Sequence, residues 1–92
     1  MVGIERTYDV LGGEPRIAGT RVGVLDIYEL VAGVGHSPED IADQIDLSLA
    51  EIYAALAHYH EHAAEMRELR RERDEMESRL VKEALSPPEP AQ

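Results

Sequence analysis

The stretch SPEDIADQIDLSLAEIYAALAHY, residues 37–59, contains two helix starts in quick succession. Ser37 is followed three residues later by Asp40, and Ser48 is followed three residues later by Glu51. A serine can cap a helix by accepting the backbone N–H three residues on, and an acid there can bond back to the serine N–H. We therefore predict a short helix after Ser37 and another helix after Ser48, separated by a brief turn.

A further helix is predicted upstream of these two. Ile27, Leu30, Val31 and Val34 recur at helical spacing and form one apolar stripe, and the glycines that follow end the helix. The resulting order of three helices is that of a helix-turn-helix array. Before it, residues 1–24 form short extended pieces joined by glycine turns, which predicts two or three β segments and a hairpin.

The chain after Ser48 contains no helix-stopping residue before Ser86. A continuous helix over this stretch could be about 38 residues long, roughly 57 Å at 1.5 Å per residue. The predicted fold is mainly α, with short N-terminal β segments, a tri-helical helix-turn-helix core (homeodomain-like or winged) and a long C-terminal helix. The predicted organisation is a domain over residues 1–60, an extended charged helix over residues 61–85 and a disordered tail over residues 86–92.

The composition is strongly acidic, with 19 Asp and Glu against 9 Lys and Arg and a net charge of −10. This charge opposes avid binding to nucleic acids and membranes at ordinary salt. A salt-rich cytoplasm screens such self-repulsion, since the Debye length falls to about 3 Å near 1 M, so we interpret the protein as halophilic, with an acidic mesophilic protein as the alternative. The chain has no cysteine for disulfides, no signal peptide and no apolar run of about 18 residues, which predicts a cytoplasmic protein without membrane contact.

The helix expected over residues 61–85 carries eight acids, six bases and a thin apolar seam. Its seam follows steps of three and four, with an arginine at one position: Met66, Leu69, Arg73, Met76 and Leu80. Such a seam is weak as an isolated coiled coil and suits docking against a partner helix or groove. We therefore expect this helix to make a dimer or partner contact.

A second feature is the glycine-rich stretch GGEPRIAGTRVG, residues 12–23. Backbone N–H groups of a glycine-rich loop, aided by guanidinium groups, can hold phosphates, which makes Arg6, Arg16 and Arg21 the candidate nucleic-acid contacts. In the alternative interpretation the glycines adopt positive φ angles and the arginines pair with nearby acids. Such acids include Asp9, Glu14 and Asp26.

Base-specific DNA binding by the third helix is disfavoured. Between Ser48 and His60 the chain has no Lys or Arg, whereas phosphate neutralisation and base readout depend on such side chains. DNA therefore remains a weak candidate partner, expected through the loop arginines if at all.

Metal binding and catalysis have little support in the sequence. His58, His62 and Glu65 can share one helical face and bind Zn²⁺ or Ni²⁺, but they make only a partial site and a solvated helix face explains them better, so we expect no metal and no cofactor. The chain has no cysteine nucleophile, and its four serines lack the context of a catalytic triad. We therefore expect a protein that is not an enzyme.

Two ordered motifs resemble a known family. YDVLGGEPRIAGTRV, residues 8–22, and GHSPEDIADQIDLSLAEIYAALAHY, residues 35–59, resemble the domain of unknown function 433 family, whose hallmarks are a GGxPxIxGTR run and later SPEEIA and LTxEEIxxAL elements. The resemblance spans about residues 4–62 and leaves out the charged helix beyond. Its motif positions here are Gly12, Gly13, Pro15, Ile17, Gly19, Thr20 and Arg21.

This resemblance implies a VapB-like antitoxin of a type II toxin–antitoxin pair, encoded beside a PIN-like nuclease. In such a pair the folded module dimerises and can autoregulate its operon, while a C-terminal segment folds along the toxin and blocks its active site. We expect the helix over residues 61–85 to bind the toxin, with Arg70, Arg71 or Arg73 engaging its catalytic acids. The alternatives are an acidic homodimeric helix-turn-helix transcription regulator and a structural adaptor without a toxin.

Overall fold

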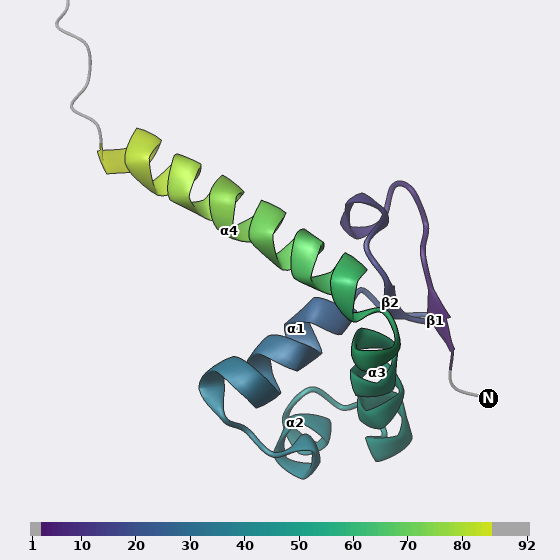
Figure 1. Cartoon of the computed structure of the whole chain (residues 1–92). Coiled ribbons are helices and arrows are strands. Elements are labelled where there is room, and N and C mark those ends of the chain that lie inside the picture. Colours follow the sequence, from purple (N-terminus) through teal and green to yellow (C-terminus); the bar gives the residue numbers. More distant parts are fainter. Residues whose placement is uncertain (1–2, 86–92) are drawn as a thin grey trace, which may run out of the picture.

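The protein is described here by a computed structural model, which covers residues 3–85. Two short strands precede a helical array, and the long helix α4 runs away from the rest of the molecule (Figure 1). The elements in chain order are β1 (Ile4–Glu5), η1 (Leu11–Gly13), β2 (Arg16–Ile17), α1 (Val24–Tyr28), η2 (Glu29–Val34), α2 (Pro38–Gln44), α3 (Leu49–Glu61) and α4 (Ala63–Leu85). The predicted mainly α fold is confirmed.

The N-terminal hairpin joins β1 and β2 in antiparallel register, with Ile4 opposite Ile17. This confirms the predicted β segments. The connecting loop turns sharply at Leu11, Gly12 and Gly13, whose φ angles are 51°, 63° and 84°. Positive φ is tolerated best by glycine, so the paired glycines are needed for this turn.

The predicted caps of the two middle helices are confirmed. The Ser37 hydroxyl accepts the Asp40 backbone N–H at 3.1 Å at the start of α2. At the start of α3 the Ser48 hydroxyl accepts the Glu51 N–H at 3.1 Å, and the Glu51 carboxylate accepts the Ser48 N–H at 2.9 Å. Both caps satisfy backbone donors that a helix start leaves without partners.

The first predicted helix has two parts. After α1 the chain continues as the π-helical turn η2 and ends at Gly35, which has a φ of 93°. The backbone N–H of Gly35 donates to the carbonyl of Leu30 at 3.1 Å. Of the predicted apolar stripe, Ile27 is buried and Leu30 and Val31 pack against the core, while Val34 is 67% exposed.

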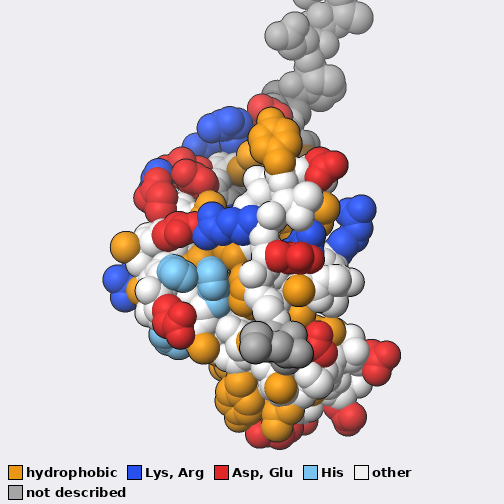
Figure 2. All heavy atoms as spheres, turned by 90° about the vertical axis from the view of Figure 1, so that its right-hand side faces the viewer, with side chains coloured by type: hydrophobic (Ala, Val, Ile, Leu, Met, Phe, Trp, Pro, Cys, Tyr) orange, Lys and Arg blue, Asp and Glu red, His pale blue; other side chains and the backbone are white. Residues whose placement is uncertain are grey.

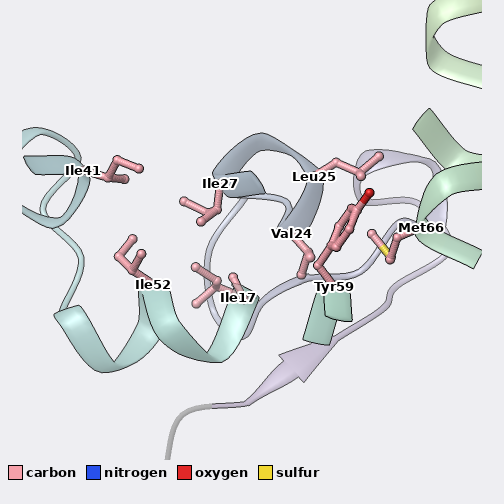
Figure 3. Close-up of a cluster of buried hydrophobic side chains, with 9 residues drawn as sticks. Ile17, Val24, Leu25, Ile27, Ile41, Ile52, Tyr59 and Met66 are labelled. Atoms are coloured by element: carbon pink, nitrogen blue, oxygen red, sulfur yellow. The ribbon is translucent and has the colours of Figure 1, made fainter. Parts of the chain in front are cut away.

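The core lies where α3 meets α1, α2 and β2 (Figure 3). It is almost entirely aliphatic, with one tyrosine, as the absence of Phe and Trp requires. Its buried members are Ile17, Val24, Leu25, Ile27, Ile41, Ile52, Ala55, Tyr59 and Met66. Met66 comes from α4, so the core extends beyond the boundary expected at residue 60.

The stretch after Ser48, which could form one helix of about 38 residues by its sequence, forms two helices. The chain leaves helical geometry at His62, with φ −123° and ψ 42°, and a separate helix starts at Ala63. The change of direction places Met66 among the core side chains, where it is fully buried. Burying a methionine side chain contributes about 1.5–3 kcal/mol, enough to outweigh the local preference for an unbroken helix.

No helix within residues 3–85 is both long and apolar enough to cross a membrane. The disordered tail expected over residues 86–92 lies outside the described residues.

Candidate partner-binding surface on the C-terminal helix

The first half of α4 is held against the rest of the chain by three kinds of contact. Met66 is completely buried, and Leu69 packs at the edge of the same core. Arg70 and Arg73 reach across to α1, to its continuation η2 and to the N-terminal loop. Four of the six side chains expected to bind a partner therefore have contacts within their own chain.

Arg73 joins three segments that are distant in sequence. Its Nη1 donates to Oδ1 of Asp26 at 3.0 Å, and its Nη2 donates to Oε1 of Glu14 at 2.8 Å. Burial works against the charged form of Arg73, but the negative charges of Glu14 and Asp26 outweigh it and raise the pKa of Arg73. We call these three residues the arginine clamp.

Asp26, besides its contact with Arg73, also accepts a hydrogen bond from the backbone. Its Oδ2 accepts the backbone N–H of Gly23 at 3.1 Å, at the start of α1. Gly23 has no side chain to cap the helix, so Asp26 provides the missing acceptor from inside the first turn. The same carboxylate thus starts α1 and anchors α4.

Arg70 forms a second anchor over a pair of tyrosines. The rings of Tyr28 and Tyr59 stack at a centroid distance of 3.6 Å, and the Arg70 guanidinium lies 5.1 Å from the Tyr28 centroid. Arg70 donates from Nη1 to the Tyr59 hydroxyl at 3.3 Å and from Nε to Oε1 of Glu29 at 2.9 Å. These partners, Tyr59 first, raise the pKa of Arg70 and keep the guanidinium charged.

The second half of α4 makes no comparable contacts within the described chain. Its large apolar side chains are more than half exposed: Met76 59%, Leu80 56%, Val81 54% and Leu85 79%. Met76 and Leu80 continue the helical face that Met66 and Leu69 begin, because the spacing of three and four residues is kept. We call residues 74–85 the distal half of α4, and its apolar face is the candidate partner-binding surface.

The arginines of α4 form two groups: Arg70, Arg71 and Arg73 make ion pairs, whereas Arg67 and Arg79 make none within residues 3–85. Arg71 contacts Glu68 and Glu75 along the helix surface, and Arg70 and Arg73 are engaged as described. Arg79 is exposed and forms no ion pair with any residue in the described part of the chain. A guanidinium without an ion pair is available to acids on another molecule.

The three arginines considered for phosphate contact have different surroundings. Arg16 is buried at 7% exposure and donates to Glu5 at 2.5 Å and to the Thr7 hydroxyl at 2.7 Å. Arg6 pairs with Glu65 of α4, and Arg21 is exposed. Of the three, Arg21 alone has its charged group free for a ligand.

The predicted pairing with acids is found for two of the three arginines, but not with the acids named as examples. Arg16 and Arg6 do pair with carboxylates, but with Glu5 and Glu65 rather than with Asp9, Glu14 or Asp26. Glu14 and Asp26 are taken by Arg73 instead. The backbone N–H of Gly19 and then Arg16 hold the pKa of Glu5 below its ordinary value of 4.5.

The remaining motif glycine, Gly19, lies in the turn that leads from β2 to α1. Its φ of 77° is a conformation that glycine adopts more easily than other residues. The Thr20 hydroxyl donates to the Ile17 carbonyl at 2.8 Å and accepts the Val22 N–H at 3.0 Å. Pro15 and Ile17 are buried. Most of the motif therefore builds the hairpin and the core rather than a ligand site.

On the face seen in Figure 2 the charges are mixed rather than gathered. Basic side chains lie next to acidic ones on this face, which has no broad basic area. A surface of this kind gives little electrostatic attraction for phosphates.

The histidines of α3 do not form a metal centre with Glu65. The rings of His58 and His62 lie 4.3 Å apart, while Glu65 is paired with Arg6. Across residues 3–85 no group of three or more His, Asp or Glu side chains is placed to hold a metal ion. The buried Nε2 of His58 has no hydrogen-bond partner within this range, and burial lowers the pKa of His58.

Sequence reasoning missed the residues that receive the α4 arginines. Glu14, Asp26, Glu29, Tyr28 and Tyr59 carry no local signal for this role, because their partners lie 11 to 59 residues away in the chain. The one available hint is charge: five of the eight arginines lie between residues 63 and 85, whereas residues 1–60 hold ten acids and three bases.

Comparison with known protein families assigns most of the chain to one family. A model of the family described as Protein of unknown function (DUF433) matches residues 4–59. No curated protein and no solved structure matches the chain. The matched region ends with α3 and thus covers the docking site for α4 but not α4 itself.

Proposed function

We propose that this chain, which belongs to the DUF433 family, is the antitoxin of a cytoplasmic type II toxin–antitoxin pair and neutralises a PIN-like nuclease by protein–protein binding. One observation carries the proposal: the distal half of α4 extends beyond its own domain with Met76 and Leu80 more than half exposed. A helix face of this kind is suited to a hydrophobic groove on a partner.

The distal half can combine apolar docking with charge recognition. The active site of a metal-dependent nuclease is lined by carboxylates that hold cations. Arg79 has no ion pair within residues 3–85, unlike Arg70, Arg71 and Arg73, so it is the guanidinium best placed to meet such carboxylates. In this proposal Met76 and Leu80 anchor the helix and Arg79 occupies the cation site.

The first test is recovery of the partner from the native host. A tagged chain is purified at high salt, and the eluate is analysed by mass spectrometry and light scattering. We expect a stoichiometric small nuclease that is silent in the complex and active once separated. A nuclease that is equally active when bound would overturn the proposal.

The surface is then tested with the purified pair. A double variant Met76→Glu, Leu80→Glu is expected to weaken the complex at least about tenfold, or about 1.4 kcal/mol, because it places charge on the apolar face. The matched control is Ser78→Glu, Lys82→Gln, which changes the net charge equally on the opposite side of the helix. Equal effects of the two variants would contradict a specific apolar contact.

Arg79 is tested separately by activity. Arg79→Gln is expected to release measurable nuclease activity from the complex. Arg67→Gln is the control, since Arg67 is also an exposed arginine of α4 without an ion pair in the described chain but precedes the distal half. Full inhibition by both variants would exclude the role of Arg79.

A structural adaptor without nucleic-acid binding is the second candidate. It is favoured by Arg16 being buried, Arg6 being paired and α3 carrying no Lys or Arg. A transcription regulator instead must shift its operator specifically at high salt. Specific binding to DNA upstream of the gene would therefore decide for the regulator, and the absence of any nuclease partner would decide for the adaptor.

A further inference from the structure

The joint between α3 and α4 is a single residue. His62 alone leaves helical geometry, and hydrogen bonds of helical spacing exist on both sides of it: His62 N–H donates to the His58 carbonyl at 3.0 Å, and Met66 N–H donates to the His62 carbonyl at 2.9 Å. The two helices are therefore one φ/ψ change away from a continuous helix.

The local sequence favours that continuous helix. Residues 57–70, AHYHEHAAEMRELR, contain no glycine, proline, serine or asparagine that would end a helix at this place. Ala, Glu, Met, Leu and Arg are among the best helix formers. The bend thus persists because α4 docks on its own domain, not because the joint requires it.

Docking of α4 depends on a surface that another copy of the chain also possesses. Met66 enters a site among core side chains that includes Tyr59, Arg73 meets Glu14 and Asp26, and Arg70 meets Glu29. Every one of these receiving groups belongs to residues 3–61. A second copy presents the same receiving site, already complementary to α4 in shape and charge.

We infer that the chain forms a dimer by exchange of α4: the bend at His62 straightens, and α4 of each copy docks on the domain of the other. Exchange of identical elements is a low-cost route to a dimer, because the interactions between α4 and its own domain form again between α4 and the domain of the other copy. A hinge as short as this one favours such an exchange. The inference does not depend on the toxin proposal, since it concerns only the first half of α4.

Exchange links two small units but leaves each core as it is, because the same α4 contacts form again. A compact unit of about 60 residues buries only about 60% of the surface that its unfolded chain exposes, so its stability is marginal and opening of α4 is correspondingly easy. In the exchanged dimer both distal halves remain outside the domains.

The inference predicts opposite effects of two substitutions at the joint. Ala63→Pro disfavours the straight helix, where a proline at this position clashes with the carbonyl of Tyr59 and lacks its N–H, but fits the first residue of a separate α4. His62→Ala removes a poorer helix former at the bend and favours the straight form. Solution mass is measured by light scattering over a hundredfold range of protein concentration.

We expect a dimer of twice the 10.2 kDa chain mass for the wild type. His62→Ala should lower the concentration of half-dimerisation several-fold, and Ala63→Pro should raise it at least tenfold. A wild type and a His62→Ala variant that both remain monomeric at every concentration would overturn the inference.

A charge-exchange experiment separates helix exchange from any other dimer. One chain carries Arg73→Glu, and the other carries Glu14→Lys with Asp26→Asn, so that each is mismatched within itself. If α4 is exchanged, the mixture restores complementary pairs at both sites: the introduced glutamate meets the introduced lysine at one, and the native Arg73 meets the native Glu14 at the other. The introduced asparagine retains an oxygen for the Gly23 N–H, which protects the start of α1.

We expect each charge variant alone to form at least tenfold less dimer than the mixture. The mixture should contain a one-to-one heterodimer with a higher melting temperature than either variant. A mixture that melts as the sum of its separate components, or a wild-type dimer that Ala63→Pro leaves unchanged in mass and affinity, would show that α4 stays on its own domain.

Discussion

Arg16 and Arg21 lie five residues apart in one glycine-rich loop, yet the first is buried and the second exposed. Burying a guanidinium is costly unless its donors find acceptors. Glu5 and Thr7 supply acceptors for its two terminal nitrogens, so Arg16 joins β2 to the preceding strand and loop, although its buried Nε has no partner within residues 3–85. The scarce positive charge of this loop therefore serves the fold at one position and is left for solvent or a ligand at the other.

Replacing these two arginines should separate the roles. Arg16→Ala is expected to lower the free energy of unfolding by about 1–3 kcal/mol, because it removes the buried hydrogen bonds from Arg16 to Glu5 and to the Thr7 hydroxyl. Arg21→Ala should change it by no more than about 0.5 kcal/mol, as is usual for exposed positions. Urea denaturation measures both. Equal losses would show that Arg16 is not the structural residue.

His58 should make stability depend on pH. Burial of its ring, followed by the charges of His62 and Arg6, lowers the pKa of His58 below 6.5, with Glu61 acting in the opposite direction. The unfolded chain therefore binds a proton near pH 6.5 that the folded chain binds only at lower pH, so the free energy of unfolding decreases as the pH falls through this value.

A His58→Gln variant tests this dependence. Its stability should change less between pH 7.5 and pH 5.5 than that of the wild type, because one titrating group with different folded and unfolded pKa values is gone. Thermal unfolding at several pH values gives the comparison, with pH 8 as the common reference. An unchanged pH slope would remove His58 as the cause.

At the scale of elements, the caps of α2 and α3 could be predicted, because cap and acceptor lie only three residues apart. Ser48→Ala is expected to cost about 1 kcal/mol of stability, since it removes the hydroxyl that accepts the Glu51 N–H. Ser78→Ala, on the exposed surface of α4, is the matched control and should be close to neutral. Chemical denaturation of both variants checks the difference.

The end of α3 could not be predicted in the same way. No residue near His62 stops a helix, and the bend depends on Met66 reaching the core and on Arg73 reaching an acid 59 residues earlier in the chain. Spacing did identify Met76 and Leu80 as surface residues of one helical face. It could not show that Met66 and Leu69, on the same face, are covered by the chain itself.

At the scale of the whole molecule, the high net charge is expected to make stability depend on salt. A net charge of −10 on 92 residues makes the folded state repel itself, and raising the salt from 0.1 M to 1 M shortens the Debye length from about 10 Å to about 3 Å. We therefore propose that the protein is adapted to high salt and expect the melting temperature to rise over this range. A gain of about 1 kcal/mol corresponds to roughly 4–8 °C for a domain of this size.

The double variant Asp43→Asn, Asp74→Asn is the control for this salt effect. Both side chains are exposed, so the change lowers repulsion without removing core contacts. Its melting temperature should be higher at 0.1 M salt and should rise less on going to 1 M. A melting temperature that falls with salt in the wild type would mean that the ion pairs of α4 outweigh the repulsion.

The elongated outline, 60 × 27 × 23 Å, results from α4 extending beyond its domain and has a consequence for turnover. A protease meets Arg79 and Lys82 on an exposed helix, whereas Arg70 and Arg73 are engaged with the domain. Trimming would begin at the C-terminal end and spare the folded unit. The distal half of α4, with the proposed partner-binding surface, would then be removed first. The protein would lose its ability to bind a partner before its domain is degraded.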